Sequence, residues 1–378
     1  MGTLKQSVFA VSLSLLSPLV LAQSSVTLYG IVEDGITYVN NSGGKGGVVA
    51  LTSSIAQGNR WGLQGAEDLG GGWKTIFKLE NGFNPNNGKL GNGGLLFGRT
   101  AYVGLTSDRF GTLTVGRQYD AVPDFYALTT MNGNWGAYFS HVNDIDNSDS
   151  TYRINNSLKY ATPTLGGLQF EALYALGGVP GSIAANSTVS AGLRYSSGPL
   201  YVAAVYTSSK QPATQFPDGN WVANEAHPSI NGAFGYVGHP ASMQVAGVGG
   251  TYQIGAARLG ISYDNVRFAS ANGTNSSSIF NNYEVWGQYY ITPSVALAGG
   301  YTFTTVAAAN DSDGGHPKYH QFNIIADWFL SKRTDLQLLA VLQTTSGGAF
   351  ADIYNGYPAT QSSTNRQILT RLGIRHKF

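Results

Sequence analysis

The chain has 378 residues, and its 22 basic residues nearly balance its 21 acidic residues. Only 11 % of the residues are charged, whereas soluble domains average about 25 %. The absence of cysteine excludes thiol catalysis, cysteine-based zinc sites and disulfides. A net charge near zero argues against a nucleic-acid ligand, because phosphate binding needs a clustered excess of Lys and Arg. The 50 glycines and 12 % aromatic residues favour an all-β fold.

The first 22 residues have the pattern of a secretory signal peptide. Lys5 is their only charge, and it precedes an apolar run that ends at Ala22. Val20 and Ala22 occupy the positions where a signal peptidase requires small residues. A membrane anchor is the alternative, but the run is shorter than the roughly 20 residues that span a bilayer as a helix. We therefore expect cleavage before Gln23 and export of a mature chain, residues 23–378, with 21 basic and 21 acidic residues.

Apolar and polar residues alternate along the mature chain, which is typical of strands with two unlike faces. In residues 258–264, for example, arginine, glycine, serine and aspartate alternate with leucine, isoleucine and tyrosine. The expected connections between strands are short or long in turn. Short turns are expected at residues 70–72, 107–111, 162–167, 196–199, 254–257, 291–294 and 331–335, and long polar loops at 39–58, 84–96, 118–151, 178–188, 207–243, 264–281, 306–319 and 346–366.

These connections separate sixteen strands, an even number with short turns at one end and long loops at the other, as in outer-membrane barrels. In lipid each unpaired backbone group costs several kcal/mol, so the sheet must close on itself. Closure of sixteen strands leaves room for an aqueous channel. A soluble sandwich or propeller is the alternative, but it would lack this asymmetry of turns and loops. The sequence therefore predicts an all-β fold, a sixteen-stranded antiparallel transmembrane barrel formed by residues 23–378.

Several motifs follow one another in order along the mature chain. They are SVTLYGIV at 25–32, NRWGLQG at 59–65, EDLGGG at 67–72, FGRTAYVGL at 97–105, FGTLTVGRQYD at 110–120 and the terminal Phe378. Together they resemble the Gram-negative general porins of β-proteobacterial type. The resemblance implies a homotrimer of sixteen-stranded barrels, a third long loop (118–151) folded inward to narrow the pore, and recognition of Phe378 by the outer-membrane assembly machinery. It assigns no role to the long loop 207–243.

The first strand departs from the porin pattern at Asp34, which shares the phase of Leu28 and therefore faces lipid or a neighbouring subunit. Because a carboxylate on the lipid face is costly, we expect Asp34 near the rim of the barrel or in the trimer contact. Trimer contacts are expected along the first and last strands, with Tyr29 and Phe378 as candidate aromatic positions.

Basic side chains gather on one wall. Arg60 and Arg153 are opposite in phase to their apolar neighbours and are expected to face the lumen at its long-loop end, and Lys74 and Lys78 add charge to the same wall. Neighbouring strands lie about 4.8 Å apart, so these side chains would form a basic ladder across the pore.

Two further arginines, Arg99 and Arg117, belong to this candidate wall, but their orientation stays open. Strict alternation places both on the apolar face of their strands. The resemblance to porins implies that they face the lumen. Both lie at strand ends, where a bulge or the start of a loop can switch the phase.

Opposite the basic wall, loop 118–151 carries five aspartates and no basic residue. Asp120 and Asp124 are the candidate acidic residues of the constriction, and the sequence Pro-Asp-Phe around Asp124 resembles the step at which the porin loop enters the lumen. Glu33 and Glu80 are the strand acids expected in the lumen. Opposed charges create a transverse field that aligns polar solutes and sorts ions. Since the basic residues outnumber these acids, we expect a weak to moderate anion preference.

The predicted function is a passive diffusion channel for small hydrophilic solutes and ions, and no cofactor or metal is expected. The six histidines are scattered, and the neighbours Ser140 and His141 do not form a catalytic dyad by adjacency alone. A substrate-selective porin for an organic acid or anion is the alternative. A surface enzyme or adhesin would require a smaller barrel of ten or twelve strands.

Overall fold

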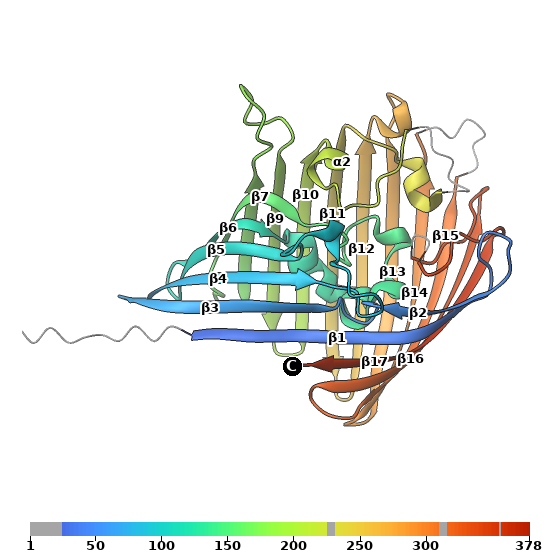
Figure 1. Cartoon of the computed structure of the whole chain (residues 1–378), viewed down its shortest axis with the longest axis horizontal. Coiled ribbons are helices and arrows are strands. Elements are labelled where there is room, and N and C mark those ends of the chain that lie inside the picture. The colour runs from blue at the N-terminus through green and yellow to red at the C-terminus, as the bar shows by residue number, and fades with distance from the viewer. Residues whose placement is uncertain (1–24, 225–230, 310–315, 355–356) are drawn as a thin grey trace, which may run out of the picture.

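The computed structural model describes residues 25–224, 231–309, 316–354 and 357–378, so the predicted signal peptide lies outside the described residues. Within these ranges, seventeen antiparallel strands form one sheet, which curves around a central space (Figure 1). The strands are β1 (Ser25–Val39), β2 (Val48–Ser53), β3 (Arg60–Gly70), β4 (Trp73–Gly82), β5 (Thr100–Ser107), β6 (Gly111–Gln118), β7 (Ile154–Ala161), β8 (Leu168–Ala175), β9 (Thr188–Ser197), β10 (Leu200–Lys210), β11 (Ser242–Ile254), β12 (Ala257–Ala269), β13 (Ser278–Thr292), β14 (Val295–Ala307), β15 (Lys318–Phe329), β16 (Thr334–Ser346) and β17 (Arg366–Lys377).

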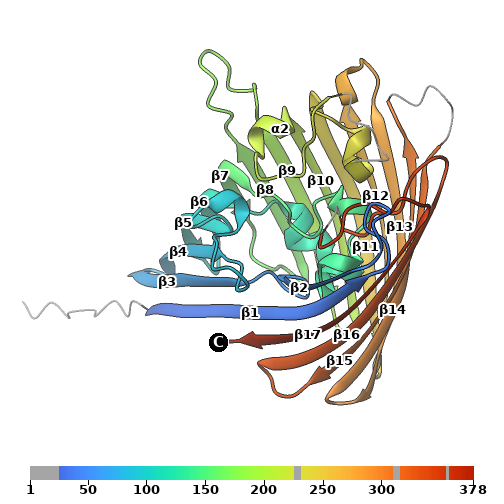
Figure 2. The ribbon, with the colours of Figure 1, turned by 45° about the vertical axis from the view of Figure 1, so that its right-hand side comes forward.

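The sheet closes into a barrel because the first strand pairs with the last (Figure 2). Ile36 on β1 lies opposite Leu372 on β17, and the backbones of Gly30 and Phe378 exchange two hydrogen bonds of 3.0 Å. Along its other edge, β1 pairs first with β3 and then with β2. β2 and β3 therefore share one place in the wall, interrupted by residues 54–59. In the described chain the barrel has the sixteen predicted strand places, one of them split.

Two long loops are shorter than the sequence predicts. Residues 39–58 are not a single loop, since β2 lies within them and pairs with β1 through Tyr38 and Val49. Residues 264–281 are largely strand, because β12 runs to Ala269 and β13 begins at Ser278. Residues 48–51 are an apolar run without alternation. At the end of β12 the apolar Val266 and Phe268 are buried inside while Arg267 is exposed, the reverse of the pattern elsewhere.

Exposure alternates along the strands in the opposite sense to that of a soluble protein. On β12, Leu259 and Ile261 are 51 % and 64 % exposed on the outside of the barrel, whereas Ser262 and Asp264 are buried on the inside. Large apolar side chains are exposed on the outside of other strands as well, among them Ile324 on β15. A contiguous apolar surface of this kind is unfavourable in water, so the outer face of the barrel is the face that contacts hydrocarbon.

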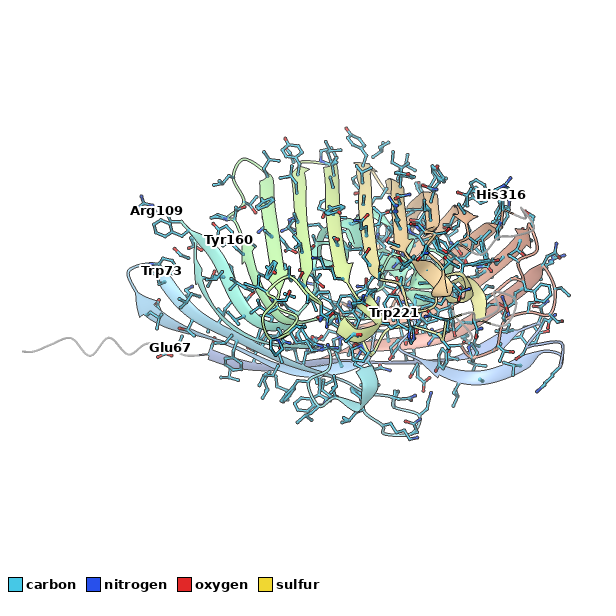
Figure 3. All side chains as sticks on the ribbon, turned by 90° about the horizontal axis from the view of Figure 1, so that it is seen from above. Glu67, Trp73, Arg109, Tyr160, Trp221 and His316 are labelled. Atoms are coloured by element: carbon cyan, nitrogen blue, oxygen red, sulfur yellow. The ribbon has the colours of Figure 1, made fainter. Side chains whose placement is uncertain are left out.

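Aromatic side chains gather at the short-turn end of the outer face. Trp73 stacks on Phe110 with 5.5 Å between ring centres, and the hydroxyl of Tyr160 donates to the carbonyl oxygen of Phe110 at 2.7 Å. Trp73, Arg109 and Tyr160 lie together at one margin of the barrel (Figure 3). Because aromatic rings with a polar edge favour the membrane interface, this cluster marks one boundary of the membrane-spanning wall.

Residues 119–153, called loop 3 below, join β6 to β7 and fold into the barrel, where their short helices lie between the two sides of the wall (Figure 1). Hydrogen bonds tie the loop to the inner face of the long strands, as between Tyr201 on β10 and the carbonyl of Phe125 at 2.8 Å. Among the described residues, every helix is too short or too polar to cross a membrane. The helices are η1 (Asn92–Gly94), η2 (Val122–Tyr126), η3 (Ala127–Thr129), α1 (Met131–Trp135), η4 (Ala137–Phe139), η5 (Val142–Asp144), α2 (Pro212–Gln215), η6 (Gly232–Tyr236) and η7 (Ala271–Gly273).

Candidate functional site

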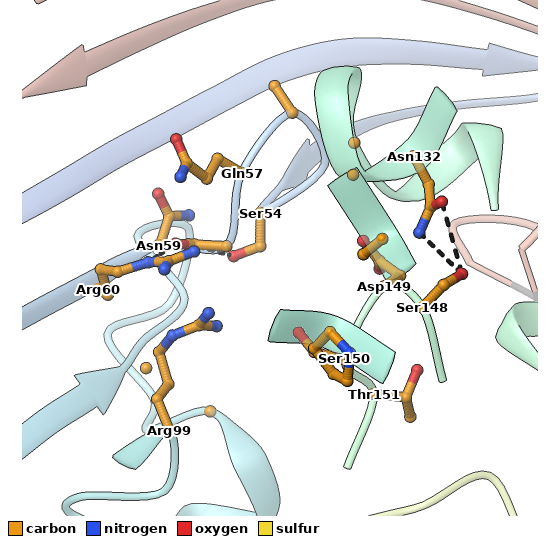
Figure 4. Close-up of a pocket in the computed structure, with 18 of the residues that line it drawn as sticks. Ser54, Gln57, Asn59, Arg60, Arg99, Asn132, Ser148, Asp149, Ser150 and Thr151 are labelled. Carbon is orange, nitrogen blue, oxygen red and sulfur yellow. Dashed lines mark hydrogen bonds between the residues drawn. The ribbon is translucent and has the colours of Figure 1, made fainter. Parts of the chain in front are cut away.

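A cavity of about 730 Å³ lies inside the barrel, between loop 3 and the part of the wall that holds β3, β4 and β17. Figure 4 shows Arg60 and Arg99 on the strand side and Asn132, Ser148 and Asp149 on the side of loop 3. Five basic and two acidic residues line the cavity, which therefore carries an excess of positive charge. The basic residues are Arg60, Arg99, Arg153, Arg375 and Lys377, and the acidic residues are Asp124 and Asp149.

Three of these arginines converge on one side of the cavity. Arg99 and Arg153 each donate an N–H group to the hydroxyl oxygen of Tyr119, at 2.9 Å and 3.1 Å. Arg60 lies in the same group, with its guanidinium 3.8 Å from the carboxylate of Glu80. We call Arg60, Arg99 and Arg153 the arginine cluster. Arg60 lies at the start of β3, Arg99 directly before β5, and Arg153 at the end of loop 3, directly before β7. The barrel brings these three positions together.

Glu80 lies among the basic residues and not across the pore from them. Its carboxylate is 2.8 Å from the guanidinium of Arg99 and 3.4 Å from the ammonium group of Lys78. Lys78 therefore belongs to the charge network of this wall, although it does not line the cavity. Lys74 points the same way as Lys78 but is exposed near the short-turn end of β4, opposite Asp68. It is separated from the arginine cluster along the strand.

The orientation of Arg99 and Arg117 follows from local departures from strand geometry. Arg99 precedes β5, so alternation along that strand does not determine where it points. Arg117 lies at a shift in the pairing of β6 with β7, where Gly116 has φ of +143°. The side chain of Arg117 donates to Asp218 and to Asn155, at 2.5 Å and 2.7 Å. Both arginines point inward, and Arg117 is bound to the long loop that follows β10.

The two predicted acids of loop 3 occupy different environments. Asp124 lines the cavity, and its carboxylate is 2.5 Å from the ammonium group of Lys159. Asp120 is buried and accepts a hydrogen bond from Thr207 on β10 at 2.9 Å. Burial raises the pKa of Asp120 to about 6, although Thr207 partly opposes that shift. Asp120 therefore fastens the start of loop 3 to the wall and does not face the arginine cluster.

Asp149 is the acid that faces the arginine cluster, and the sequence analysis did not single it out. It lines the cavity and accepts a hydrogen bond of 2.9 Å from the hydroxyl of Tyr354. Burial raises the pKa of Asp149 to about 7, while the hydroxyl of Tyr354 and the charges of Arg153 and Arg99 oppose this rise. The charge of the side chain therefore changes near neutral pH.

Two expectations for the first strand need correction. Glu33 points inward as its phase predicts, but its side chain is fully buried in an ion pair with Arg371, so its charge does not line the cavity. Tyr29 also points inward, since its hydroxyl donates to Glu80 at 2.7 Å. By sequence Tyr29 is a candidate aromatic position near the trimer contact, but its inward direction does not fit a position in an outer aromatic girdle. Asp34 does lie on the outer phase, where its carboxylate accepts the N–H of Gly35 at 2.8 Å.

A buried cluster holds the middle of loop 3 against the long strands. Nδ1 of His141 is 2.9 Å from Asp146 and 3.0 Å from Asp264 on β12, and Nε2 is 3.7 Å from Glu284 on β13. Burial by itself lowers the pKa of His141, but Asp146 and Asp264 outweigh it and raise the pKa well above its usual value. We call these four residues the histidine cluster. His141 is thus an imidazolium within loop 3.

Loop 3 also contacts residues 54–59, the segment that separates β2 from β3. The N–H of Ala137 donates to the carbonyl of Ile55 at 2.7 Å. The preceding residue, Gly136, has φ of +110°, and a Cβ atom there would lie 2.0 Å from the same carbonyl oxygen. Only glycine permits this approach. Loop 3 is therefore bound to the wall at Asp120, at His141 and at Ala137.

The comparisons with known proteins agree with this architecture. A sequence profile for a family described as "Gram-negative porin" matches residues 9–348. An outer membrane porin protein of Bordetella pertussis is 32 % identical over 272 residues, which is 64 % of this chain and 64 % of that protein. Outer membrane porin protein 32 of Delftia acidovorans is 35 % identical over 179 residues, 46 % of this chain and 50 % of that protein. The chain thus spans less than two thirds of the length of these two relatives.

A solved structure shares the fold over nearly its whole length. The anion-selective porin from Comamonas acidovorans superposes with a TM-score of 0.76 at 23 % sequence identity, covering 94 % of this chain and 100 % of that chain. At 23 % identity the two proteins share the barrel fold, and their ion selectivity cannot be compared from this similarity.

Proposed function

The chain belongs to the Gram-negative porin family, and from this premise we propose that it forms a channel for passive diffusion of small hydrophilic solutes and ions, with a weak to moderate preference for anions. Family membership places it in the outer membrane of a Gram-negative bacterium. The anion preference, the roles of individual residues and the assembly state are proposals about this chain.

One observation carries the anion preference, namely the five basic and two acidic residues that line the cavity. Arg60 is 3.8 Å from the only acid that it approaches among the described residues, and Arg99 shares that acid. An anion that loses part of its hydration shell in the cavity gains N–H donors in return, whereas a cation meets net repulsion. The effect is modest because the cavity is wet and salt screens its charges.

The arginine cluster also favours a second reading, a substrate-selective porin for organic anions. Guanidinium groups bind carboxylates with two parallel hydrogen bonds, so several of them on one wall suit a carboxylate or phosphate. The dependence of the ion current on solute concentration distinguishes a general channel from a selective one. A general channel conducts in proportion to solute concentration, whereas a selective channel shows current block that saturates with a particular organic anion.

We further propose that the channel is a homotrimer whose subunits meet along the outer face of the first and last strands. Leu28, Ile36 and Leu51 are exposed there beside the closure of the barrel. Asp34 lies on the same face and would be less costly in a contact between subunits than in lipid. The mass of the detergent-solubilised complex tests this proposal. Sequencing of the N-terminus of the mature protein tests the signal peptide, and we expect it to begin at Gln23. Deletion of Phe378 tests the assembly signal, and we expect it to impair assembly in the outer membrane.

A planar-bilayer recording in a KCl gradient tests the proposed function. We expect water-filled channels whose zero-current potential has the sign of chloride preference. A channel that prefers potassium at neutral pH would contradict the anion preference. A preparation that passes no ions would contradict the channel itself.

A further inference from the structure

Tyr119 occupies the centre of the arginine cluster, immediately after the end of β6. Its hydroxyl oxygen accepts N–H groups from Arg99 and Arg153 at 2.9 Å and 3.1 Å. The guanidinium carbon of Arg153 also lies 5.2 Å from the centre of the Tyr119 ring. A guanidinium has donors and no acceptor, so the phenol oxygen can only accept from these two arginines. The side chain lines the cavity and is therefore within reach of permeating ions.

We propose that Tyr119 is a specificity-determining residue, a resident acceptor that competes with permeating anions for the N–H groups of the arginine cluster. When its hydroxyl is ionised, the side chain also cancels one positive charge of this cluster. This inference rests on the proposed anion preference and goes beyond it, because it names the residue that limits that preference.

Tyr119 competes with anions because the arginine cluster has a limited number of N–H donors. The contact with Tyr119 uses one N–H group of Arg99 and one of Arg153, and Arg99 gives another to Glu80 at 2.8 Å. An anion in the cavity must share the remaining donors or displace the phenol oxygen. A phenylalanine at this position would keep the ring and release two N–H groups into the cavity. Removal of the hydroxyl should therefore strengthen anion binding, whereas loss of a merely structural contact would not.

The charges around Tyr119 favour its ionised form. Burial by itself raises the pKa of the phenol, but Arg153, Arg99 and Arg60 outweigh burial and the opposing charge of Glu80, and they lower the pKa to about 8. The basic groups that face Tyr119 are Arg60 from β3, Arg99 before β5, Arg153 before β7 and Lys159 on β7, whose ammonium group donates to the Tyr119 carbonyl at 3.1 Å. The acidic groups are Glu80 on β4 and two residues of loop 3 that line the cavity, Asp149 and Asp124. The carboxylate of Asp124 is 2.5 Å from the same ammonium group of Lys159.

The test compares the wild-type channel with Tyr119→Phe in bilayers, with the zero-current potential in a KCl gradient measured from about pH 6 to about pH 9.5. This range spans the lowered phenol pKa of about 8 and ends below the usual phenol pKa of about 10. For the wild type we expect the chloride preference to fall roughly two- to threefold across this range, the effect of one added negative charge close to the arginine cluster. The Tyr119→Phe channel should keep its preference at the alkaline end. Sulfate, which stays divalent throughout, serves as the binding probe and should block the variant at a lower concentration than the wild type.

Asp149 requires a matched control, since it also titrates near neutral pH. The Asp149→Asn channel should lose the part of the profile near pH 7, at the pKa of about 7, and keep the alkaline part. A wild-type channel with chloride preference and no alkaline change would overturn the inference and leave the proposed function intact. An alkaline change that persists in Tyr119→Phe, or equal sulfate block in both channels, would also overturn it. A wild type without chloride preference at about pH 6 would instead contradict the proposed function.

Discussion

Two charge clusters inside the barrel differ in their balance and in their access to water. The arginine cluster lines a cavity and carries more positive charge than its one close acid, Glu80, can neutralise. The histidine cluster is buried, and three carboxylates surround its single imidazolium. Both clusters are unbalanced, but only the arginine cluster can use ions from solution to offset its charge.

The difference separates conduction from anchoring. An excess charge beside water attracts counter-ions, which is what an ion-selective pore requires. An excess charge away from water must be reduced by protons or hydrogen bonds, because an isolated buried ion is very costly. The hydroxyl of Tyr126 and the side chain of Asn282 donate to Asp264 at 2.9 Å and 2.8 Å, which satisfies part of this need. The histidine cluster therefore fixes loop 3, and the arginine cluster acts on solutes.

The largest expected effect is a loss of stability in His141→Ala, which leaves three buried carboxylates without their cation. Removal of one partner of a buried ion pair costs about 3–5 kcal/mol, so the unfolding temperature in detergent should fall sharply. Because the folded-state pKa of His141 is raised, its stabilising contribution is complete below the unfolded pKa of about 6.5 and is lost as pH rises through the raised folded pKa. The difference between variant and wild type should therefore shrink at high pH.

His376→Ala is the control for that experiment. His376 is exposed on β17 and its ring contacts Thr334 at 2.8 Å, so its removal should leave the unfolding temperature almost unchanged. Equal unfolding temperatures of His141→Ala and wild type at about pH 6 would show that the histidine cluster does not anchor loop 3.

A smaller effect is expected from Asp149→Asn, which removes a negative charge opposite the arginine cluster. At about 10 Å in water one unit charge contributes about 0.4 kcal/mol, roughly a factor of two in ion preference. Since the pKa of Asp149 is about 7, the variant should prefer chloride more strongly than the wild type above that pH and match it well below. A difference of the same size at acid pH would refute this assignment.

The smallest effect is expected from Lys74→Gln. Lys74 lies about 20 Å along β4 from Glu80, at about 3.3 Å per residue, and charges at that distance are screened in physiological salt. The zero-current potential should match that of the wild type, whereas Arg153→Gln should reduce the chloride preference. A comparable loss in both variants would mean that selectivity is not confined to the cavity.

The sequence predicts the barrel well because its wall follows one simple rule. Lipid outside and water inside impose a period of two on every strand, and that period is visible without a structure. The interruption at residues 54–59 breaks the rule. Ile55 and Ala56 are buried there against loop 3, a contact between distant parts of the chain that leaves no periodic signal.

The site was less predictable for the same reason. The inward phase of Arg60 follows from alternation, whereas Arg153 precedes β7 and Arg117 depends on the irregular pairing of β6 with β7. Tyr119 and Asp149 belong to loop 3, where a side chain's direction depends on tertiary packing and not on a period. The one sequence signal for Tyr119 is its position two residues after Arg117, at the end of a predicted strand, in the motif Gly-Arg-Gln-Tyr-Asp.

The central claim, that excess positive charge beside loop 3 sets the selectivity of the pore, is tested most directly by Arg60→Glu combined with Arg153→Glu. This double substitution changes the lining of the cavity from five basic and two acidic residues to three basic and four acidic residues. In a KCl gradient we expect the zero-current potential to change sign, from chloride preference to potassium preference. An unchanged potential in channels that still conduct would contradict the claim.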